Sequence, residues 1–365
     1  MIEGPVAIIG TGLMGGSLGL ALRRARPDLD VIGYDADPGM ANGALERGAV
    51  TTLAPTAGSA AGPARLVALG VPVDQAAQVL GDLEGSVDKG AVVTDLGSAK
   101  ALVVEHGTRH FGPQFVGGHP MAGSERHGIE AADASLFEGA WWILTPTQQT
   151  SPEAYARVTD VVGAVGAQPV ALEPDVHDAL VARLSHLPQL VASAIVDVAA
   201  SAGDREALLG LAAAGFRDVT RIAASNPDMW VATIRANEAA VLGAIRTLRG
   251  RLDWLERDIA AGEWQTLRAW LDQARSARME LFAKPDYGTE PVALSMVIPD
   301  RPGVLAEVTT AAGELGANIE DLRIMHSTEG GAGRLELVVA GREPAELLVG
   351  ELIRLGYSVH RSNIN

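Results

Sequence analysis

The residues best suited to chemistry stand in two short polar segments, each directly after a run of apolar, β-forming residues. Residues 95–100 read Asp-Leu-Gly-Ser-Ala-Lys, and residues 117–125 read Gly-Gly-His-Pro-Met-Ala-Gly-Ser-Glu. Ligands of open α/β sheets bind at the carboxyl ends of the strands, so both segments are expected at that edge. A single histidine is more often structural, but the glycine pair before His119 and the proline after it favour an imidazole presented for catalysis.

A third polar segment, residues 215–221, reads Gly-Phe-Arg-Asp-Val-Thr-Arg in a region of helical pattern. The two arginines, Arg217 and Arg221, suit a substrate that carries carboxylates, because a guanidinium pairs with a carboxylate through two hydrogen bonds. The alternative is a surface ion pair with Asp218, which would account for one of the arginines more readily than for both.

The elements that must position these residues begin with a glycine loop. Residues 6–10 are a short apolar β-type run, residues 10–15 read Gly-Thr-Gly-Leu-Met-Gly, and a helical stretch follows over 17–26. Strand, G-x-G-x-x-G loop and helix in this order are typical of dinucleotide-binding units. The three glycines permit the tight turn, the close approach of a pyrophosphate and the packing of helix on strand. Cofactor contacts are therefore expected from Gly10, Gly12, Leu13, Met14 and Gly15.

An acidic residue ends the second predicted strand. Asp35 follows the run 31–34 and stands twenty residues after Gly15. A carboxylate there can accept hydrogen bonds from the ribose hydroxyls and would repel a 2′-phosphate. No arginine or lysine lies between Asp35 and Glu46, so NAD is favoured over NADP. The alternative is a glycine-rich turn beside a solvated aspartate.

The pattern of apolar runs divides the chain into three parts. Further β-type runs alternate with helical patterns up to residue 172, which predicts a Rossmann-type, doubly wound parallel sheet in residues 1–172. Helical spacing, broken at Gly203, Gly215, Asn226-Pro227 and Gly262, predicts an all-helical domain in residues 173–283. Residues 290–365 follow the order βαββαβ, which predicts an α+β domain with two helices on one face of an antiparallel sheet.

The composition limits the class of protein. A net charge of −16 would repel a phosphate backbone, so nucleic acid is not an expected partner. The chain has no cysteine, which excludes disulfides and a thiol nucleophile. No apolar run reaches the roughly 18 to 20 residues of a membrane helix, and the first residues lack a basic leader, so a cytoplasmic protein with no membrane partner is expected.

Five motifs in order give residues 1–283 a resemblance to the prephenate dehydrogenase family. They are the glycine loop, DLGSAK at 95–100, GGHPMAGSE at 117–125, SHLP at 185–188 and GFRDVTRIA at 215–223. The resemblance implies NAD-dependent oxidative decarboxylation of prephenate, or of arogenate as the alternative, by a homodimer in tyrosine biosynthesis. It implies that His119 is the catalytic histidine, that Ser98 orients it and the substrate hydroxyl, and that Arg221 holds a substrate carboxylate. The positions implied to line the active site are Ser124, Glu125, His186, Arg217, Asp218 and Trp230.

This chain departs from the family pattern at two positions. Gln189 stands where the family often has a second histidine after SHLP, and Arg217 replaces a frequent lysine. Both changes leave open whether the substrate is prephenate or arogenate.

The C-terminal part resembles the ACT domain, a family of small regulatory modules that usually bind amino acids between paired subunits. The resemblance rests on the sequences DRPGVL at 300–305 and GANI at 316–319. It implies feedback by tyrosine. A dimerisation module without a ligand is the alternative.

Other activities fit the sequence less well. β-Hydroxyacid dehydrogenases resemble this layout but use a lysine from the interdomain helix, and no lysine lies between Ala101 and Ala283. A pyrroline-carboxylate-type reductase would not explain residues 117–125. A non-catalytic sensor of NAD and an amino acid would not need His119 with Ser98 and Arg221. A metal site is not expected, because His177 and Asp178 are adjacent and no further ligands stand at a familiar spacing.

Overall fold

The computed structural model describes residues 4–123, 126–201, 214–281, 291–299, 301–326 and 332–363. The chain divides into two compact units, Met1–Arg257 and Asp258–Asn365. The first unit holds a large sheet and most of the helices that follow it. The second holds a last long helix and a small antiparallel sheet.

The large sheet has eight strands in the order β3-β2-β1-β4-β5-β6-β7-β8. Its first six strands have the 3-2-1-4-5-6 order of dinucleotide-binding sheets. The order of the strands reverses between β1 and β4, which are parallel. The strands are β1 (Val6–Ile9), β2 (Val31–Tyr34), β3 (Thr52–Leu53), β4 (Leu66–Leu69), β5 (Val92–Asp95), β6 (Phe115–Pro120), β7 (Trp141–Thr145) and β8 (Gln168–Ala171). The helices between them are α1 (Leu13–Ala25), α2 (Pro38–Glu46), α3 (Ala57–Ala61), α4 (Val73–Asp82), α5 (Ala101–Phe111) and α6 (Pro152–Ala164).

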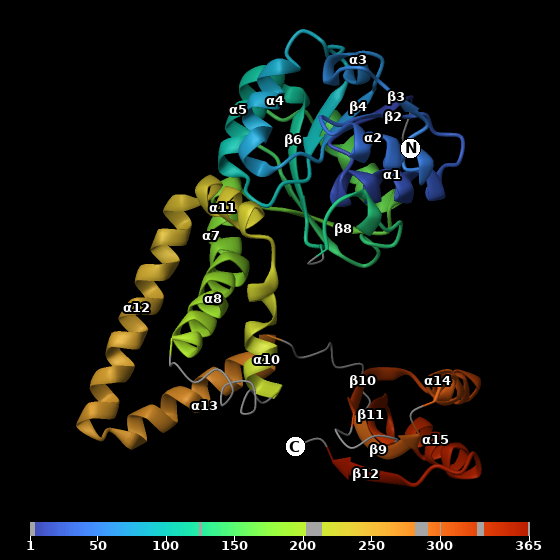
Figure 1. Ribbon diagram of the computed structural model, residues 1–365, viewed down its shortest axis with the longest axis vertical. Helices are drawn as coiled ribbons and strands as arrows, with labels where there is room; N and C mark the ends of the chain where they lie inside the picture. Colours follow the sequence, from blue (N-terminus) through green and yellow to red (C-terminus); the bar gives the residue numbers. More distant parts are fainter. Residues whose placement is uncertain are drawn as a thin grey trace. The chain divides into compact units, whose positions relative to one another are not determined.

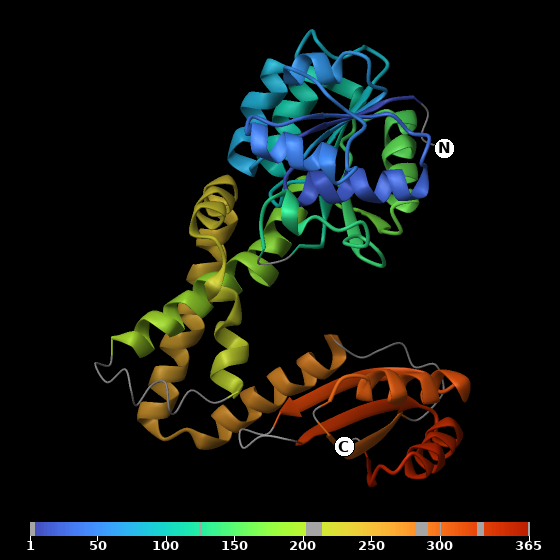
Figure 2. The same cartoon turned by 45° about the vertical axis from the view of Figure 1, so that its right-hand side comes forward.

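Helices lie on both faces of this sheet (Figures 1 and 2). Alternate residues of a strand point to opposite faces, so an apolar strand such as β1 needs cover on both sides. Ile8 packs in one buried cluster with Leu18 and Leu22 of α1, and Ile9 packs in the other with Leu80 of α4. The predicted doubly wound sheet is therefore confirmed.

The last two strands add a feature that the apolar pattern did not reveal. β7 pairs with β6 in the antiparallel direction, and β8 then runs parallel to β7. A parallel connection needs a long crossover, usually a helix, and the described residues between β6 and β7 form only a single 3-10 turn, Ile129–Ala131. The chain therefore returns along β6 in the opposite direction.

The helical part follows β8 directly. It contains α7 (Pro174–Val181), a π-helical turn (Ala182–His186), α8 (Leu187–Ala200), α10 (Ala214–Thr220), a 3-10 turn (Arg221–Ala224), α11 (Pro227–Ala236) and α12 (Glu238–Ala261). The predicted break at Asn226-Pro227 is real, because the Asn226 side chain accepts from the Asp228 N–H and caps α11. Gly262, with φ of 72°, follows the end of α12. Gly215 does not break a helix but lies inside α10, and Gly203 lies outside the described residues.

Among the described residues, one helical stretch is long and apolar enough to cross a membrane by length and composition alone. It is Pro174–Ala200, which joins α7, the π turn and α8. The stretch contains buried polar side chains, His177, Asp178 and His186, that are bonded to other parts of the chain. A core helix of a soluble protein passes the same test, so this is weak evidence for a span.

The second unit contains α13 (Trp264–Leu281) and a four-stranded antiparallel sheet in the order β10-β11-β9-β12. Leu294, Met296 and Ile298 alternate along β9 and pack against Val308 of α14 and Leu348 of α15. The observed order of elements is the predicted βαββαβ. The elements are β9 (Pro291–Pro299), α14 (Val304–Glu314), β10 (Ile319–His326), β11 (Ala332–Ala340), α15 (Arg342–Arg354) and β12 (Val359–Asn363).

Candidate active site

The glycine loop joins β1 to α1 in the conformation that its glycines allow. Gly10 has φ of 91°, which residues with a side chain rarely adopt. A Cβ on Gly15 would lie 1.9 Å from the Gly10 carbonyl oxygen, so the loop and α1 could not pack this closely. A Cβ on Gly12 would meet no atom within 4 Å, so this side of the loop is open. The first turn of α1, which begins with Leu13 and Met14, has neither an acidic side chain nor a side-chain cap, and this suits a bound phosphate.

The carboxylate of Asp35 lies against the same loop. The Thr11 backbone N–H donates to Asp35 Oδ2 at 2.7 Å, and the Asp37 N–H donates to Asp35 Oδ1 at 2.9 Å. The side chain is thus held beside the loop and remains partly exposed. This is where a ribose of a dinucleotide on the loop would present its hydroxyls.

His119 lies near the end of β6, and the two glycines before it are required by packing. A Cβ on Gly117 would lie 2.3 Å from the Thr145 hydroxyl oxygen, and one on Gly118 would lie 2.7 Å from the Asp95 carbonyl oxygen. Both glycines are buried, whereas His119 is only partly buried. The backbone at His119 is therefore fixed, while its side chain keeps an exposed part.

A buried ion pair holds the strand that carries His119. Lys100 Nζ forms an ion pair with Asp95, and both side chains are almost fully buried. Lys100 Nζ also donates to the Gly118 carbonyl at 2.8 Å, and the Gly118 N–H donates to Asp95 Oδ1 at 3.1 Å. Burial lowers the pKa of Lys100, and Asp95 opposes that shift. Both backbone groups of Gly118 are thus tied to this pair, one residue before His119.

The imidazole of His119 is linked to two residues that the sequence did not place in the site, directly to His177 and through it to Asp178. His119 Nδ1 lies 2.8 Å from His177 Nε2, and His177 Nδ1 lies 2.8 Å from Asp178 Oδ1. Asp178 also accepts from the backbone N–H groups of Lys100 at 2.7 Å and of Ala101 at 2.9 Å. The available signal was an adjacent histidine and aspartate in the helix α7, which the sequence led us to consider only as a metal site.

Two imidazoles of the site, those of His119 and His186, have lowered pKa values. Burial lowers the pKa of His119 well below its ordinary 6.5, and the nearby Lys100, His177 and His186 lower it further. Burial also lowers the pKa of His186 to about 4, although Asp178 opposes the shift. A neutral His119 can accept a proton near neutral pH, which is what a general base requires.

The helical part meets the sheet edge at Ser98. Ser98 Oγ lies 3.4 Å from Thr233 Oγ1 of α11. Within the described part of the chain, no hydrogen bond joins Ser98 to His119. His186 stacks edge-on against Trp230, with ring centroids 5.9 Å apart. The His186 Nδ1 also lies 3.3 Å from the Asn237 side-chain nitrogen. The structure therefore brings His186 and Trp230 together and places Ser98 where the two parts of the first unit touch.

The remaining predicted residues are less constrained. Arg217 and Asp218 of α10 and Arg221 of the next turn are exposed, and within the described residues no ion pair joins them to each other or to His119. The alternative of an Arg–Asp surface pair is thus not seen. Ser124 and Glu125 lie outside the described residues.

The fold and the site define a nucleotide-dependent dehydrogenase with a helical domain after its nucleotide-binding sheet. Residues 18–171 match the family described as "Prephenate dehydrogenase, nucleotide-binding domain", and residues 173–273 match "Prephenate dehydrogenase, dimerization domain". The chain belongs to the prephenate dehydrogenase family, which confirms the resemblance of its motifs.

Three relatives show how far the similarity extends. A prephenate dehydrogenase of Bacillus subtilis (strain 168) is 32% identical over 330 residues, which are 89% of each chain. The structure of A. aeolicus prephenate dehydrogenase in complex with hydroxyphenyl propionate and NAD+ is 33% identical, with a TM-score of 0.72 over 77% of this chain and 99% of that one. Synechocystis arogenate dehydrogenase is 31% identical, with a TM-score of 0.68 over 76% of this chain and 99% of that one.

Proposed function

We propose that this protein catalyses the NAD-dependent oxidative decarboxylation of prephenate to 4-hydroxyphenylpyruvate, a step of tyrosine biosynthesis. The observation that carries the proposal is a neutral, partly exposed imidazole, His119, fixed near the end of β6. This is the sheet edge at which ligands of such folds bind. The open side of Gly12 and the carboxylate of Asp35 support a dinucleotide there, and the absence of a cation near Asp35 in the sequence favours NAD.

The residues of the chain have distinct tasks in this reaction. His119 accepts the proton of the ring hydroxyl, and Ser98 orients that hydroxyl. Arg221 binds a substrate carboxylate, since a guanidinium with no partner among the described residues is free to do so. NAD, when bound, supplies the two-electron acceptor. Loss of CO₂ then leaves an aromatic ring. Further substrate contacts are assigned to Ser124, Glu125, His186, Arg217, Asp218 and Trp230.

The structure adds an argument against lysine-dependent chemistry. Lys100 comes one residue before the stretch that has no lysine, and it is fully buried against Asp95 and the Gly118 carbonyl. Its ammonium group is therefore bonded inside the protein and does not reach a substrate. Arogenate remains the alternative substrate, and the Synechocystis relative supports it. Gln189 is one of the two departures from the family pattern. It is buried, and its amide oxygen has no hydrogen-bond partner within the described structure. This oxygen can therefore accept a hydrogen bond from the substrate side chain and so distinguish the two substrates.

The test is a side-by-side assay of purified protein with prephenate and arogenate, each with NAD and with NADP. We expect turnover with prephenate and NAD, followed by the absorbance of the reduced nicotinamide. His119→Asn should lower kcat by about 10² to 10⁴ while NAD still binds. His360→Asn, at an exposed histidine of β12, is the matched control and should leave kcat unchanged. Wild-type turnover in the His119 variant would remove the proposed base.

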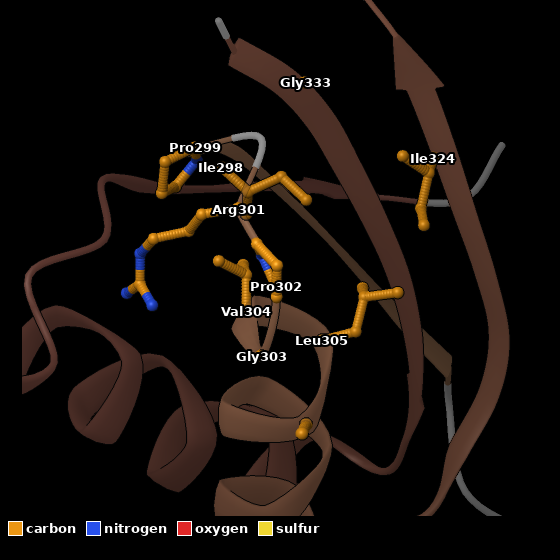
Figure 3. Close-up of a pocket in the computed structure, with 10 residues that line it drawn as sticks. Ile298, Pro299, Arg301, Pro302, Gly303, Val304, Leu305, Ile324 and Gly333 are labelled. Atoms are coloured by element: carbon orange, nitrogen blue, oxygen red, sulfur yellow. The ribbon is translucent and has the colours of Figure 1, made fainter.

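The C-terminal sheet is proposed to be an ACT-like regulatory domain that binds tyrosine. Between β9 and α14 lies a pocket of about 280 Å³, lined mainly by apolar side chains such as Val304, Leu305 and Ile324 (Figure 3). Gly303 precedes α14 in a left-handed conformation and gives it no side-chain cap, so the first N–H groups of the helix suit an amino-acid carboxylate. The ten residues around the pocket are Ile298, Pro299, Arg301, Pro302, Gly303, Val304, Leu305, Ala306, Ile324 and Gly333.

Tyrosine titration of the full-length enzyme tests this assignment. We expect inhibition by tyrosine in the wild type and its loss in Leu305→Arg, with basal activity retained. Leu347→Arg, at an exposed leucine of α15 outside the pocket, is the matched control and should keep the inhibition. Equal, tyrosine-insensitive rates in all three proteins would refute a tyrosine site here.

A homodimer in the cytoplasm completes the proposal. The match of residues 173–273 to a dimerization domain supports the dimer. The exposed apolar side chains of α8, Val196 and Val198, supply surface for a second copy. Sedimentation of the purified protein would test it, and a stable monomer at micromolar concentration would refute it.

A further inference from the structure

The base of the proposed reaction ends a buried chain of three side chains. Asp178 is 4% exposed and His177 is 0% exposed, whereas His119 retains an exposed part. Both links between ring nitrogens and their neighbours are 2.8 Å. The three residues form a chain of hydrogen bonds from α7 to the end of β6, with the carboxylate of Asp178 at its buried end.

The hydrogen-bond partners fix the direction of every proton in that line. Backbone N–H groups can only donate, so the Asp178 carboxylate accepts from Lys100 and Ala101. The third partner of this carboxylate is His177 Nδ1, which therefore carries a hydrogen and donates it. In a neutral imidazole with Nδ1 protonated, Nε2 is an acceptor. His177 Nε2 thus accepts from His119 Nδ1.

We propose that His177 and Asp178 are positioning residues that hold His119 in the tautomer whose Nε2 is free to take the substrate proton. The inference deepens the proposed dehydrogenase function and rests on it. Without the pair, His119 could place its single hydrogen on either nitrogen. With the pair in place, the hydrogen points into the protein and the basic lone pair is on Nε2.

The same arrangement suits the protonated state. When His119 Nε2 gains a proton, the Nδ1 hydrogen still points at His177 Nε2, so no bond must break or reorient. The Asp178 carboxylate lies at the other end of His177, and its negative charge favours a positive charge on His119. Catalysis needs a base that does not reorganise during proton transfer, and the buried pair supplies this.

A pair of substitutions at His177 separates positioning from packing. Glutamine in place of His177 can set its amide oxygen near the Nε2 position and still accept from His119 Nδ1, whereas leucine fills the space without an acceptor. We expect His177→Leu to lower kcat by about 10² to 10⁴ and His177→Gln to stay within about tenfold of the wild type. The KM for NAD should change by less than about threefold in both, since the glycine loop is untouched. Equal kcat values for the two variants would overturn the proposal.

The tautomer itself can be measured in the full-length protein. With ¹⁵N-labelled histidine, the ring nitrogen shifts of His119 should show the hydrogen on Nδ1 in the wild type. In His177→Leu no acceptor faces His119 Nδ1, so the hydrogen of the neutral His119 ring is no longer held there and the shifts should report a mixture of the two tautomers. A wild-type hydrogen on Nε2, or an unchanged tautomer in His177→Leu, would refute the inference. This readout needs no substrate, so it remains decisive if prephenate and arogenate are not turned over.

Discussion

Removal of the Lys100 ammonium is the sharpest test of how the site is held. Lys100→Met keeps the length and apolar volume of the side chain but leaves the buried Asp95 carboxylate without its cation. The Gly118 carbonyl loses its donor at the same time. Two backbone N–H groups, of Gly97 and Gly118, would remain as the hydrogen-bond donors to Asp95.

The expected cost follows from the burial of both partners. Breaking a buried ion pair by removing one member costs about 3 to 5 kcal/mol, because the other charge is left uncompensated. The exposed pair Arg109–Glu105 on α5 is the matched control, since its side chains are 58% and 61% exposed. Arg109→Met should lower the free energy of unfolding by no more than about 1 kcal/mol. A double variant, Lys100→Met with Asp95→Asn, should be more stable than Lys100→Met alone, because it removes the orphaned charge.

The assay is urea denaturation followed by far-UV circular dichroism and by tryptophan fluorescence, with NAD binding and kcat measured on the folded proteins. Lys100→Met should also lower kcat, because the Gly118 backbone next to His119 loses a restraint. Wild-type stability in Lys100→Met would refute the reasoning. A double variant less stable than the single one would show that Asp95 is not a charged partner of Lys100.

Three further predictions concern the cofactor and the pH profile. Gly12→Ala should weaken NAD binding by tenfold or more and leave thermal stability unchanged, because the added Cβ meets no protein atom. Gly15→Ala should destabilise the fold, because its Cβ would lie 1.9 Å from the Gly10 carbonyl oxygen. Equal melting temperatures of the two variants would contradict this. Asp35→Ser should raise the ratio of NADP to NAD use, measured as kcat/KM for each, and an unchanged ratio would move the ribose site elsewhere. Because burial and Lys100 lower the pKa of His119, the base stays unprotonated in mild acid. The rate should therefore stay level as pH falls to 6.5 and decline only below it, and a decline centred at or above 6.5 would contradict the assignment.

The fold was largely predictable because its signals are local. Apolar runs, the glycine loop and the Asn226-Pro227 break each arise from a few adjacent residues, and the structure places an element boundary at each. The direction of β7 was not predictable in this way. It depends on what the chain between Pro120 and Trp141 does in space, and a run of β-type residues reads the same in either direction.

The site was predictable where one segment carries it and not where two segments meet. His119 and Ser98 stand in conspicuous polar segments after strands, so their positions follow from the sheet. His177 and Asp178 lie 58 and 59 residues after His119 in sequence, and nothing local indicates that α7 brings them to it. Their significance comes from a tertiary contact, as does that of the bond from Lys100 to the Gly118 carbonyl.

The charges of the site also show why a lysine can lie so close to a base. A free ammonium beside His119 would strongly oppose its protonation and so weaken it as a base, and Lys100 does lower the pKa of His119. The Asp95 carboxylate in contact with Lys100 acts against this effect, since its charge is opposite to that of the ammonium. The second carboxylate, Asp178, lies on the far side of His177, where it favours positive charge on His119 once the proton arrives. Asp95 thus neutralises Lys100, the cation that fixes β6, while Asp178 favours the imidazolium of His119 that forms during the reaction. Exchanging either carboxylate for its amide should therefore make His119 a weaker base.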